Sequence, residues 1–187
     1  MEMDFLLFLQ TLHTPALDFF FSKLTLLGNG GIFWILCALA LLCTKKYRKC
    51  GILFLLSLLA CFLLGNVFLK NAVARERPCW VNTDVLLLIS NPKDFSFPSG
   101  HSMHSFVGAL SLRYANKKWG IAAFILAGLI AFSRMYLFVH YPTDVLAGIA
   151  IGLIITFLIH KFLGRILFRE NGMKANRVRE DSYHADV

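Results

Sequence analysis

Charged residues are scarce in this chain. Only 16% of its 187 residues are Asp, Glu, Lys or Arg, whereas 57% are hydrophobic. A soluble domain carries about 25% charged residues and uses them to cover its surface. The shortage therefore argues against a soluble protein with several buried helices, which would lack the polar surface to cover itself, and favours an integral membrane protein.

Three other features are missing. The chain begins Met-Glu-Met-Asp without a basic region, so no cleavable signal peptide is predicted. No disulfide framework is indicated, because Cys79 alone falls in a polar loop and the other cysteines lie in or beside apolar segments: Cys37, Cys43, Cys50 and Cys61. His101 and His104, at i and i+3, could be metal ligands, but no carboxylate cluster accompanies them, and we expect no metal.

Long apolar blocks are abundant instead, at about 30–43, 51–69, 103–112, 120–138 and 145–159. Two of them approach or reach the roughly 20 residues that cross a bilayer, and their flanks can extend the others. We therefore predict an all-α polytopic membrane protein with a bundle of five transmembrane helices. Residues 1–29 read as two amphipathic helices broken at Thr14-Pro15, lying at the outer interface; a kinked sixth span is the alternative. Gly148 and Gly152 predict a close helix contact.

The net charge of +8 comes from cations at the ends of these blocks, in 45–49, 113–118 and beyond 160. If every block crosses the membrane, these segments share one side, which the positive-inside rule makes cytoplasmic. The connections Asn71–His101 and Phe138–Thr143 then face outward. Cations at span ends meet lipid headgroups, so we expect no nucleic-acid partner. Residues 170–187 are polar and read as a disordered cytoplasmic tail.

The most informative stretch runs from Ser133 to Asp144, between two apolar blocks. Pro142 predicts a helix start, with Asp144 in the first turn and His140 just before it. A helix N-terminus offers unpaired N–H groups and a positive dipole to a phosphate. A histidine there, near a carboxylate and Arg134, is a candidate phosphoryl acceptor. A simpler role for Asp144, as an acid that stabilises the helix N-terminus, stays open and is compatible with orienting His140.

Two further clusters precede it, Lys70-x6-Arg77-Pro78 and Pro98-Ser99-Gly100-His101. Ser99 is a natural N-cap for a helix that His101 opens. Lys70 could simply extend toward lipid headgroups, and Arg75 and Glu76 read as surface charges. All three clusters lie outward in a topology that was derived from loop charge alone. This agreement predicts one site, in which cations bind a phosphoryl group while one histidine attacks and the other protonates the leaving oxygen.

These three motifs, in this order over residues 70–144, resemble those of the type 2 phosphatidic acid phosphatase superfamily. The resemblance implies that His140 is the nucleophile, that Asp144 orients it and that His101 is the general acid. It also implies that no metal or other cofactor is needed. It assigns phosphate binding to Lys70, Arg77, Ser99, Gly100 and Arg134.

Within that family, the short length and outward site are similar to those of bacterial lipid phosphatases that act on polyprenyl diphosphates. The resemblance thus implies one domain over 1–169, in the cytoplasmic membrane with an extracytoplasmic site. Its substrate would be undecaprenyl diphosphate, entering from the bilayer. The alternatives are a phosphatidylglycerophosphate or phosphatidic acid phosphatase and, from another class, a non-catalytic lipid-binding or transport protein. The sequence gives no prediction of oligomeric state.

Overall fold

The computed structural model describes residues 1–185, with side chains through Ile166, and contains no strand within that range. The predicted disordered tail, 170–187, lies outside the residues whose side chains are described and stays a prediction. The helical elements, in chain order, are α1 (Glu2–Gln10), α2 (Pro15–Leu24), η1 (Thr25–Gly31), α3 (Ile32–Leu42), α4 (Arg48–Cys61), η2 (Phe62–Leu69), α5 (Lys70–Val73), α6 (Pro78–Val81), α7 (Gly100–Ala115), α8 (Lys117–Tyr136) and α9 (Pro142–Ala185).

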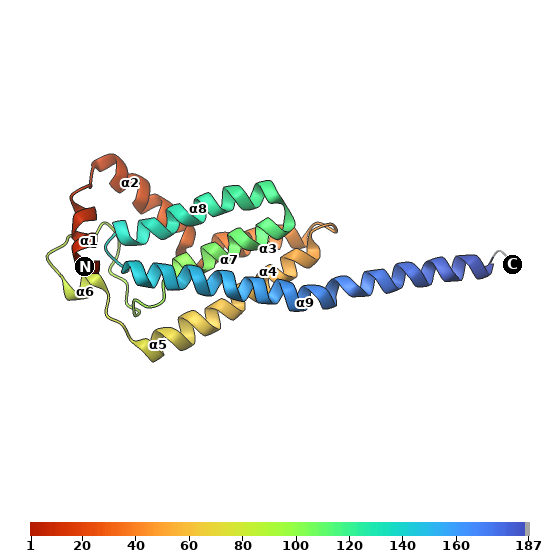
Figure 1. The fold of residues 1–187 in the computed structure, drawn as a ribbon. Helices are drawn as coiled ribbons and strands as arrows, with labels where there is room; N and C mark the ends of the chain where they lie inside the picture. Colours follow the sequence, from red (N-terminus) through yellow and green to blue (C-terminus); the bar gives the residue numbers. More distant parts are fainter. Residues whose placement is uncertain (186–187) are drawn as a thin grey trace.

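Each predicted apolar block is helical over most of its length, and the helices α3, α4, α7, α8 and α9 run alongside one another in alternating directions (Figure 1). Helix α7 lies among α4, α8 and α9, and the largest buried cluster, with Trp34, Phe54 and Met103, surrounds it. Large apolar side chains such as Leu36 and Ile125 remain exposed on the outside of the bundle. An apolar exterior around a packed interior is the arrangement that a lipid environment requires.

Four described segments are long and apolar enough to cross a membrane: Pro15–Leu42, Arg48–Val81, Lys117–Tyr136 and Pro142–Ile166. The protein is thus an all-helical, multi-pass membrane protein. Helix α7 has only 16 residues, fewer than the roughly 20 that a bilayer core requires. The count of five crossings therefore stays a prediction, although α7 lies inside the bundle and not at its surface.

The N-terminus of the chain and helix α1 lie at one end of the bundle (Figure 1). The break at Thr14-Pro15 is confirmed, since the Thr14 side chain caps α2 and Pro15 is its first residue. Helix α2 continues through η1 into α3, so the segment from Pro15 to Leu42 forms one kinked candidate span. At the kink, Gly30 and Gly31 have φ values of +57° and +67°, which glycine adopts without strain.

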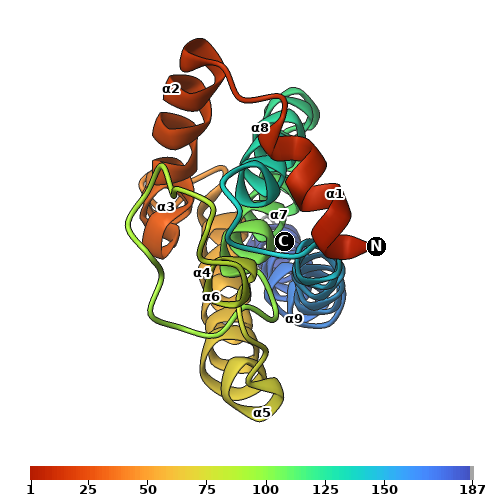
Figure 2. The ribbon, with the colours of Figure 1, turned by 90° about the vertical axis from the view of Figure 1, so that its left-hand side faces the viewer.

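Helix α1 lies across the connection between α8 and α9 (Figure 2). At one end, Gln10 Nε2 donates to the Tyr136 carbonyl, the last residue of α8, at 3.1 Å. At the other end, Glu2 Oε1 accepts from the Thr143 backbone N–H at 3.0 Å, in the first turn of α9. Helix α1 therefore contacts both ends of the connection that contains His140.

Helices α7 and α9 approach closely at the predicted glycine pair. A Cβ atom at Gly148 would lie 2.5 Å from the Ser99 carbonyl oxygen, and one at Gly152 would lie 2.5 Å from that of Met103. The predicted close contact is confirmed. It brings the starts of the two helices together, and the Ser99 N–H donates to the Asp144 carbonyl at 3.0 Å.

Candidate active site

The three motif clusters meet at one end of the bundle, which is opposite the basic α3–α4 and α7–α8 connections (Figure 1). His140 lies in the short connection between α8 and α9 and is 1% exposed. Helix α9 begins at Pro142 with Asp144 in its first turn, as predicted. The backbone N–H of His140 donates to the Arg134 carbonyl at 3.3 Å, which links the connection to the end of α8.

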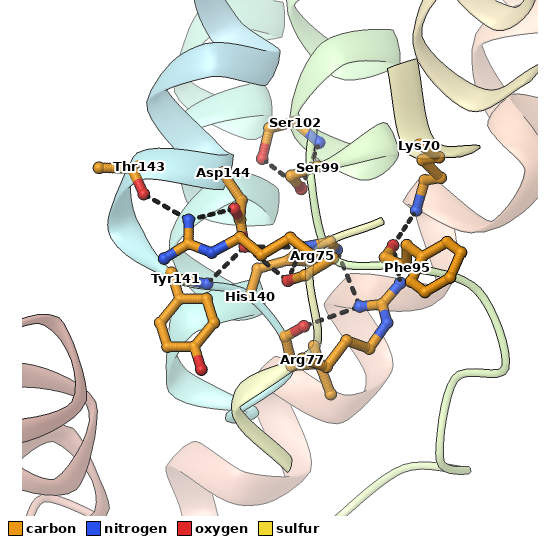
Figure 3. A network of polar contacts seen from close by, with 12 residues as sticks. Lys70, Arg75, Arg77, Phe95, Ser99, Ser102, His140, Tyr141, Thr143 and Asp144 are labelled. Atoms are coloured by element: carbon orange, nitrogen blue, oxygen red, sulfur yellow. Dashed lines mark hydrogen bonds and ion pairs between the residues drawn. The ribbon is translucent and has the colours of Figure 1, made fainter. Parts of the chain in front are cut away.

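Both ring nitrogens of His140 have polar neighbours (Figure 3). Its Nε2 lies 3.1 Å from Arg77 Nη1, and its Nδ1 lies 3.4 Å from Ser96 Oγ and 3.6 Å from Asp144 Oδ2. Asp144 is fully buried and also accepts from the Tyr141 backbone N–H at 2.9 Å. Asp144 therefore contacts the first turn of α9 and also faces the histidine, a geometry compatible with both roles that the sequence left open; the orienting role stays a prediction.

Burial lowers the pKa of His140 well below its ordinary value, and the neighbouring cations Arg77, Arg134 and Lys70 lower it further. Desolvation and positive neighbours both penalise an imidazolium. The ring is thus held in its neutral form, which is the form that can act as a nucleophile.

Lys70 and Arg77 converge on one carboxylate, that of Asp94. Lys70 Nζ lies 2.5 Å from Asp94 Oδ2, and Arg77 Nη2 lies 2.7 Å from Asp94 Oδ1. The pKa of Asp94 is subject to burial, which raises it, but the hydrogen bond and charge of Lys70 and the charge of Arg77 lower it to about 2. Asp94 therefore makes with these cations the contacts that phosphate oxygens make elsewhere.

Arg77 is rigidly placed, because each of its N–H groups has an acceptor in the protein. Nε donates to the Asp94 carbonyl, Nη1 faces the Val139 carbonyl and His140 Nε2, and Nη2 donates to Asp94 Oδ1 and the Phe95 carbonyl. Asp94 carries no sequence signal, since it is a single acid in an irregular loop 17 residues beyond Arg77. Sequence reasoning therefore missed it.

Arg134, on α8, differs from Arg77 in having donors to spare. It is 4% exposed and donates from Nη1 to Thr25 Oγ1. Its Nε is buried and has no hydrogen-bond partner among the described residues. A buried guanidinium with unsatisfied donors is a strong candidate to bind an anion, because burial leaves those N–H groups without water.

His101 opens α7, as predicted, and Ser99 caps that helix. His101 Nε2 lies 2.9 Å from Asn29 Oδ1 in η1. The η1 backbone packs so tightly on the ring that a Cβ atom at Gly28 would lie 2.4 Å from His101 Cδ2. Ser99 is fully buried, and its Oγ accepts from Ser102 Oγ at 2.9 Å.

One cavity of about 760 Å³ unites most of the predicted site. Its walls include six predicted residues: Lys70, Arg77, Gly100, His101, Arg134 and His140. Ser99 and Asp144 are not in its walls; they lie behind it, where Ser99 caps α7 and Asp144 faces His140. The roles that the sequence assigned to these residues stay predictions.

The prediction that Arg75 is a surface charge is wrong, because its guanidinium contacts a buried carboxylate beside His140. Its Nη1 donates to Asp144 Oδ1 at 2.7 Å, and its Nη2 donates to Glu2 Oε2 at 2.6 Å. These partners are 69 and 73 residues away in the chain, so no local pattern reveals them.

The expectation that no metal is needed stays a prediction, and the donor types around the histidines bear on it. Within the part of the chain whose side chains are described, no group of three or more His, Cys, Asp or Glu side chains is arranged so that it could hold a metal ion. The cavity walls instead combine the cations with backbone and amide donors and a single carboxylate, Asp94. Such a donor set suits an anion, whereas a hard metal ion requires several oxygen ligands.

The fold and the site together define a membrane helical bundle whose cavity is lined by two of the predicted histidines and three of the predicted cations. The sequence model of the PAP2 superfamily matches residues 49–167. The chain belongs to this superfamily.

Among its relatives is the undecaprenyl-diphosphatase of Sulfolobus acidocaldarius, which is 39% identical over 126 residues, covering 67% of this chain and 61% of that protein. The crystal structure of a transmembrane PAP2 type phosphatidylglycerolphosphate phosphatase from Bacillus subtilis has a TM-score of 0.74 at 30% identity, covering 88% of this chain and 85% of that one. The crystal structure of Aquifex aeolicus LpxE has a TM-score of 0.76 at 28% identity, covering 86% and 95%.

Proposed function

We propose that this protein is a lipid phosphatase that removes the terminal phosphate of a lipid diphosphate through a phosphohistidine on His140. One observation carries the proposal. A buried neutral histidine in the wall of the cavity has its Nε2 3.1 Å from Arg77, and Arg134, Lys70 and His101 lie in the same walls. This combination suits phosphoryl transfer to a histidine, because charge develops on the phosphoryl oxygens and an imidazole can attack only while it is unprotonated.

The reaction takes place in two steps. The Nε2 lone pair of neutral His140 attacks phosphorus, the bond from phosphorus to the leaving oxygen breaks, and His101, which starts this step as an imidazolium, gives that oxygen a proton and becomes neutral. Water then attacks the phosphohistidine, neutral His101 takes the proton of water, and the phosphorus–nitrogen bond breaks. Inorganic phosphate leaves, and both histidines return to their starting protonation states.

Protein cations stabilise the transferred group in this proposal, so no metal ion takes part. Arg134 contributes the unpaired Nε donor of its buried guanidinium. When substrate binds, phosphate oxygens replace the Asp94 carboxylate as the anionic partner of Lys70 and Arg77. The α7 N-terminus adds the backbone N–H of Gly100, which lines the cavity.

The cavity walls suit a lipid that enters from the bilayer. Beside the cations lie apolar side chains from three segments: Leu26, Phe62, Leu87, Leu88 and Ile89. The basic connections occupy the opposite end of the bundle, which under the positive-inside rule supports our proposal that the site faces the extracytoplasmic side of a cytoplasmic membrane.

Undecaprenyl diphosphate is the proposed substrate, with the Sulfolobus relative as support. The second candidate is a glycerolipid monophosphate such as phosphatidylglycerophosphate or phosphatidic acid. The name of the Bacillus relative favours it, and the same cations and histidines would serve a monoester. A non-catalytic role would leave a buried nucleophile, acid and cations without a function in a membrane protein, where such groups are costly.

Phosphate release by the purified protein in detergent tests the proposal, with EDTA present and the lipids at matched surface concentration. The panel compares undecaprenyl diphosphate with phosphatidylglycerophosphate and phosphatidic acid. Preference for the diphosphate supports the full proposal, whereas preference for a glycerolipid keeps the mechanism and changes the substrate. Absence of release from every lipid rejects the enzymatic function, and activity that EDTA abolishes rejects the metal-free mechanism.

A further inference from the structure

The two oxygens of Asp144 contact different groups. Oδ2 faces the site, 2.5 Å from Ser96 Oγ and 3.6 Å from His140 Nδ1. Oδ1 points away from the histidine and accepts from Arg75 Nη1 at 2.7 Å. Asp144 therefore accepts a hydrogen bond from the Ser96 hydroxyl on the side that faces the histidine, and one from the Arg75 guanidinium on the other side.

Arg75 is in turn held by three residues besides Asp144, of which Figure 3 shows Thr143 and Tyr141 beside its guanidinium. Glu2 Oε2 accepts from its Nη2 at 2.6 Å, Thr143 Oγ1 accepts from its Nη1 at 2.7 Å, and its guanidinium lies 4.0 Å from the centre of the Tyr141 ring. Glu2 belongs to α1 and also accepts from Thr143 Oγ1 at 2.8 Å. Helix α1 thus holds Arg75 in place through Glu2, and Arg75 in turn contacts Asp144.

The hydrogen bonds around His140 select one tautomer of its ring. A hydroxyl has one proton. Because Ser96 Oγ lies 2.5 Å from the Asp144 carboxylate, which can only accept, the hydroxyl donates this proton in a hydrogen bond to Asp144 Oδ2. A lone pair of Ser96 Oγ, 3.4 Å from His140 Nδ1, is then free to accept a hydrogen bond from Nδ1–H. On the other side, Arg77 can only donate, so its Nη1 requires a lone pair on Nε2.

We propose that Ser96 and Arg75, with Arg75 fixed by Glu2, are positioning residues that hold His140 as the Nδ1–H tautomer. Ser96 connects Asp144 to the ring, because Asp144 itself lies 3.6 Å from Nδ1. Arg75 balances the carboxylate charge, so that Asp144 orients the ring without drawing a second proton onto it. The consequence for catalysis rests on the proposed function, whereas the tautomer can be measured without any turnover.

Nuclear magnetic resonance of the protein labelled with ¹⁵N in its histidine rings tests the tautomer directly. The His140→Gln spectrum identifies the His140 signals. We expect the wild-type His140 to carry its proton on Nδ1 at neutral pH, and Ser96→Ala to mix the two tautomers. The control is Ser57→Ala, which removes an equally buried hydroxyl that donates within α4 to the Leu53 carbonyl at 2.7 Å. A wild-type ring protonated on Nε2, or a Ser96→Ala ring identical to wild type, overturns the proposal.

The pH profile of kcat/KM tests the charge balance. His140 faces six charged or titratable groups: Lys70, Arg77, Arg134, Asp94, Asp144 and His101. Removing Arg75 leaves Asp144 more able to stabilise an imidazolium. Arg75→Met should therefore move the acid limb to higher pH and lower kcat by about tenfold to a hundredfold, the range for loss of groups that orient imidazole ligands.

Two variants separate this role from folding. Arg75→Lys keeps the charge and should return the acid limb toward its wild-type position, and Glu2→Gln should give a smaller shift in the direction of Arg75→Met. Arg48→Met, at the opposite end of the bundle, is the control and should leave the limb in place. An unchanged limb in Arg75→Met overturns the charge role. If the wild type releases no phosphate from any lipid, the proposed function fails, and the ring spectra alone decide this inference.

Discussion

The two histidines of the site are held in different ways. His140 is 1% exposed, and both of its ring nitrogens have polar neighbours, from Arg77 on one side and Ser96 and Asp144 on the other. His101 lies in the cavity wall, and its side chain hydrogen-bonds Asn29. The difference suits the proposed roles, because the nucleophile must be aimed at phosphorus before the substrate arrives, whereas the general acid must only reach the leaving oxygen from the cavity wall.

Substituting His140, the more firmly held of the two histidines, should have the largest effect on kcat/KM. His140→Gln should lower kcat/KM by at least about 10³-fold while the protein stays in the membrane, because a single nucleophile accounts for most of such a rate enhancement. Initial rates of phosphate release measure it. His160→Gln is the control, since His160 stacks on Tyr114 outside the cavity walls. A His140→Gln enzyme with more than a few per cent of wild-type turnover would show that another group attacks.

Substituting His101 should give an effect that depends on the leaving group. His101→Ala should cost about 10² to 10⁴-fold with a lipid phosphate, the usual contribution of a general acid. With p-nitrophenyl phosphate, whose leaving oxygen needs no proton, the loss in the first step should be much smaller. Single-turnover release of nitrophenol measures this step. Equal losses with both substrates would mean that His101 binds phosphate and does not protonate the leaving group.

The pH profile sharpens the comparison further. Burial and the cations Arg77 and Arg134 lower the pKa of His140, so the neutral ring persists as the pH falls through the ordinary histidine range. We expect the acid limb of kcat/KM to lie below pH about 6.5, the unperturbed value. Rates of phosphate release across acid and neutral buffers measure it. An acid limb above that value would contradict a neutral His140 surrounded by cations.

The contact between Asn29 and His101 should give the smallest effect. Asn29→Ala removes one hydrogen bond to a ring that lines the cavity, and a single bond of this kind contributes about twofold to tenfold. The loss should appear in kcat with the lipid substrate and largely vanish with p-nitrophenyl phosphate. A loss as large as that of His101→Ala would show that η1 fixes the acid as firmly as Arg77 and Ser96 fix His140.

Much of the fold follows from the sequence, because apolar blocks of bilayer length can satisfy their backbone groups only as helices. The start of α9 at Pro142 and the cap at Ser99 follow from local stereochemistry. The meeting of the three clusters at one end follows from counting crossings between basic connections. By contrast, the length of α7 leaves the count of crossings open, since 16 residues are marginal for a span.

The positioning contacts could not be predicted, because their partners are distant in the chain. Ser96 lies 48 residues from Asp144, Arg75 lies 73 residues from Glu2, and Asn29 lies 72 residues from His101. The packing of α1 against α8 and the first turn of α9 brings Glu2 to Arg75, and the packing of η1 against α7 brings Asn29 to His101. The motifs therefore predict which groups could react, and the packing determines how each is held.

Trapping the phosphoenzyme tests the central claim most directly. The protein is mixed with a substrate whose terminal phosphate is radiolabelled and is quenched in alkali, in which phosphohistidine survives, and the labelled residue is located by peptide fragmentation. We predict label on His140 in the wild type, no label in His140→Gln, and more label in His101→Ala with an activated substrate, because water then lacks its base. Label on another residue, or steady turnover without any labelled protein, would contradict nucleophilic attack by His140.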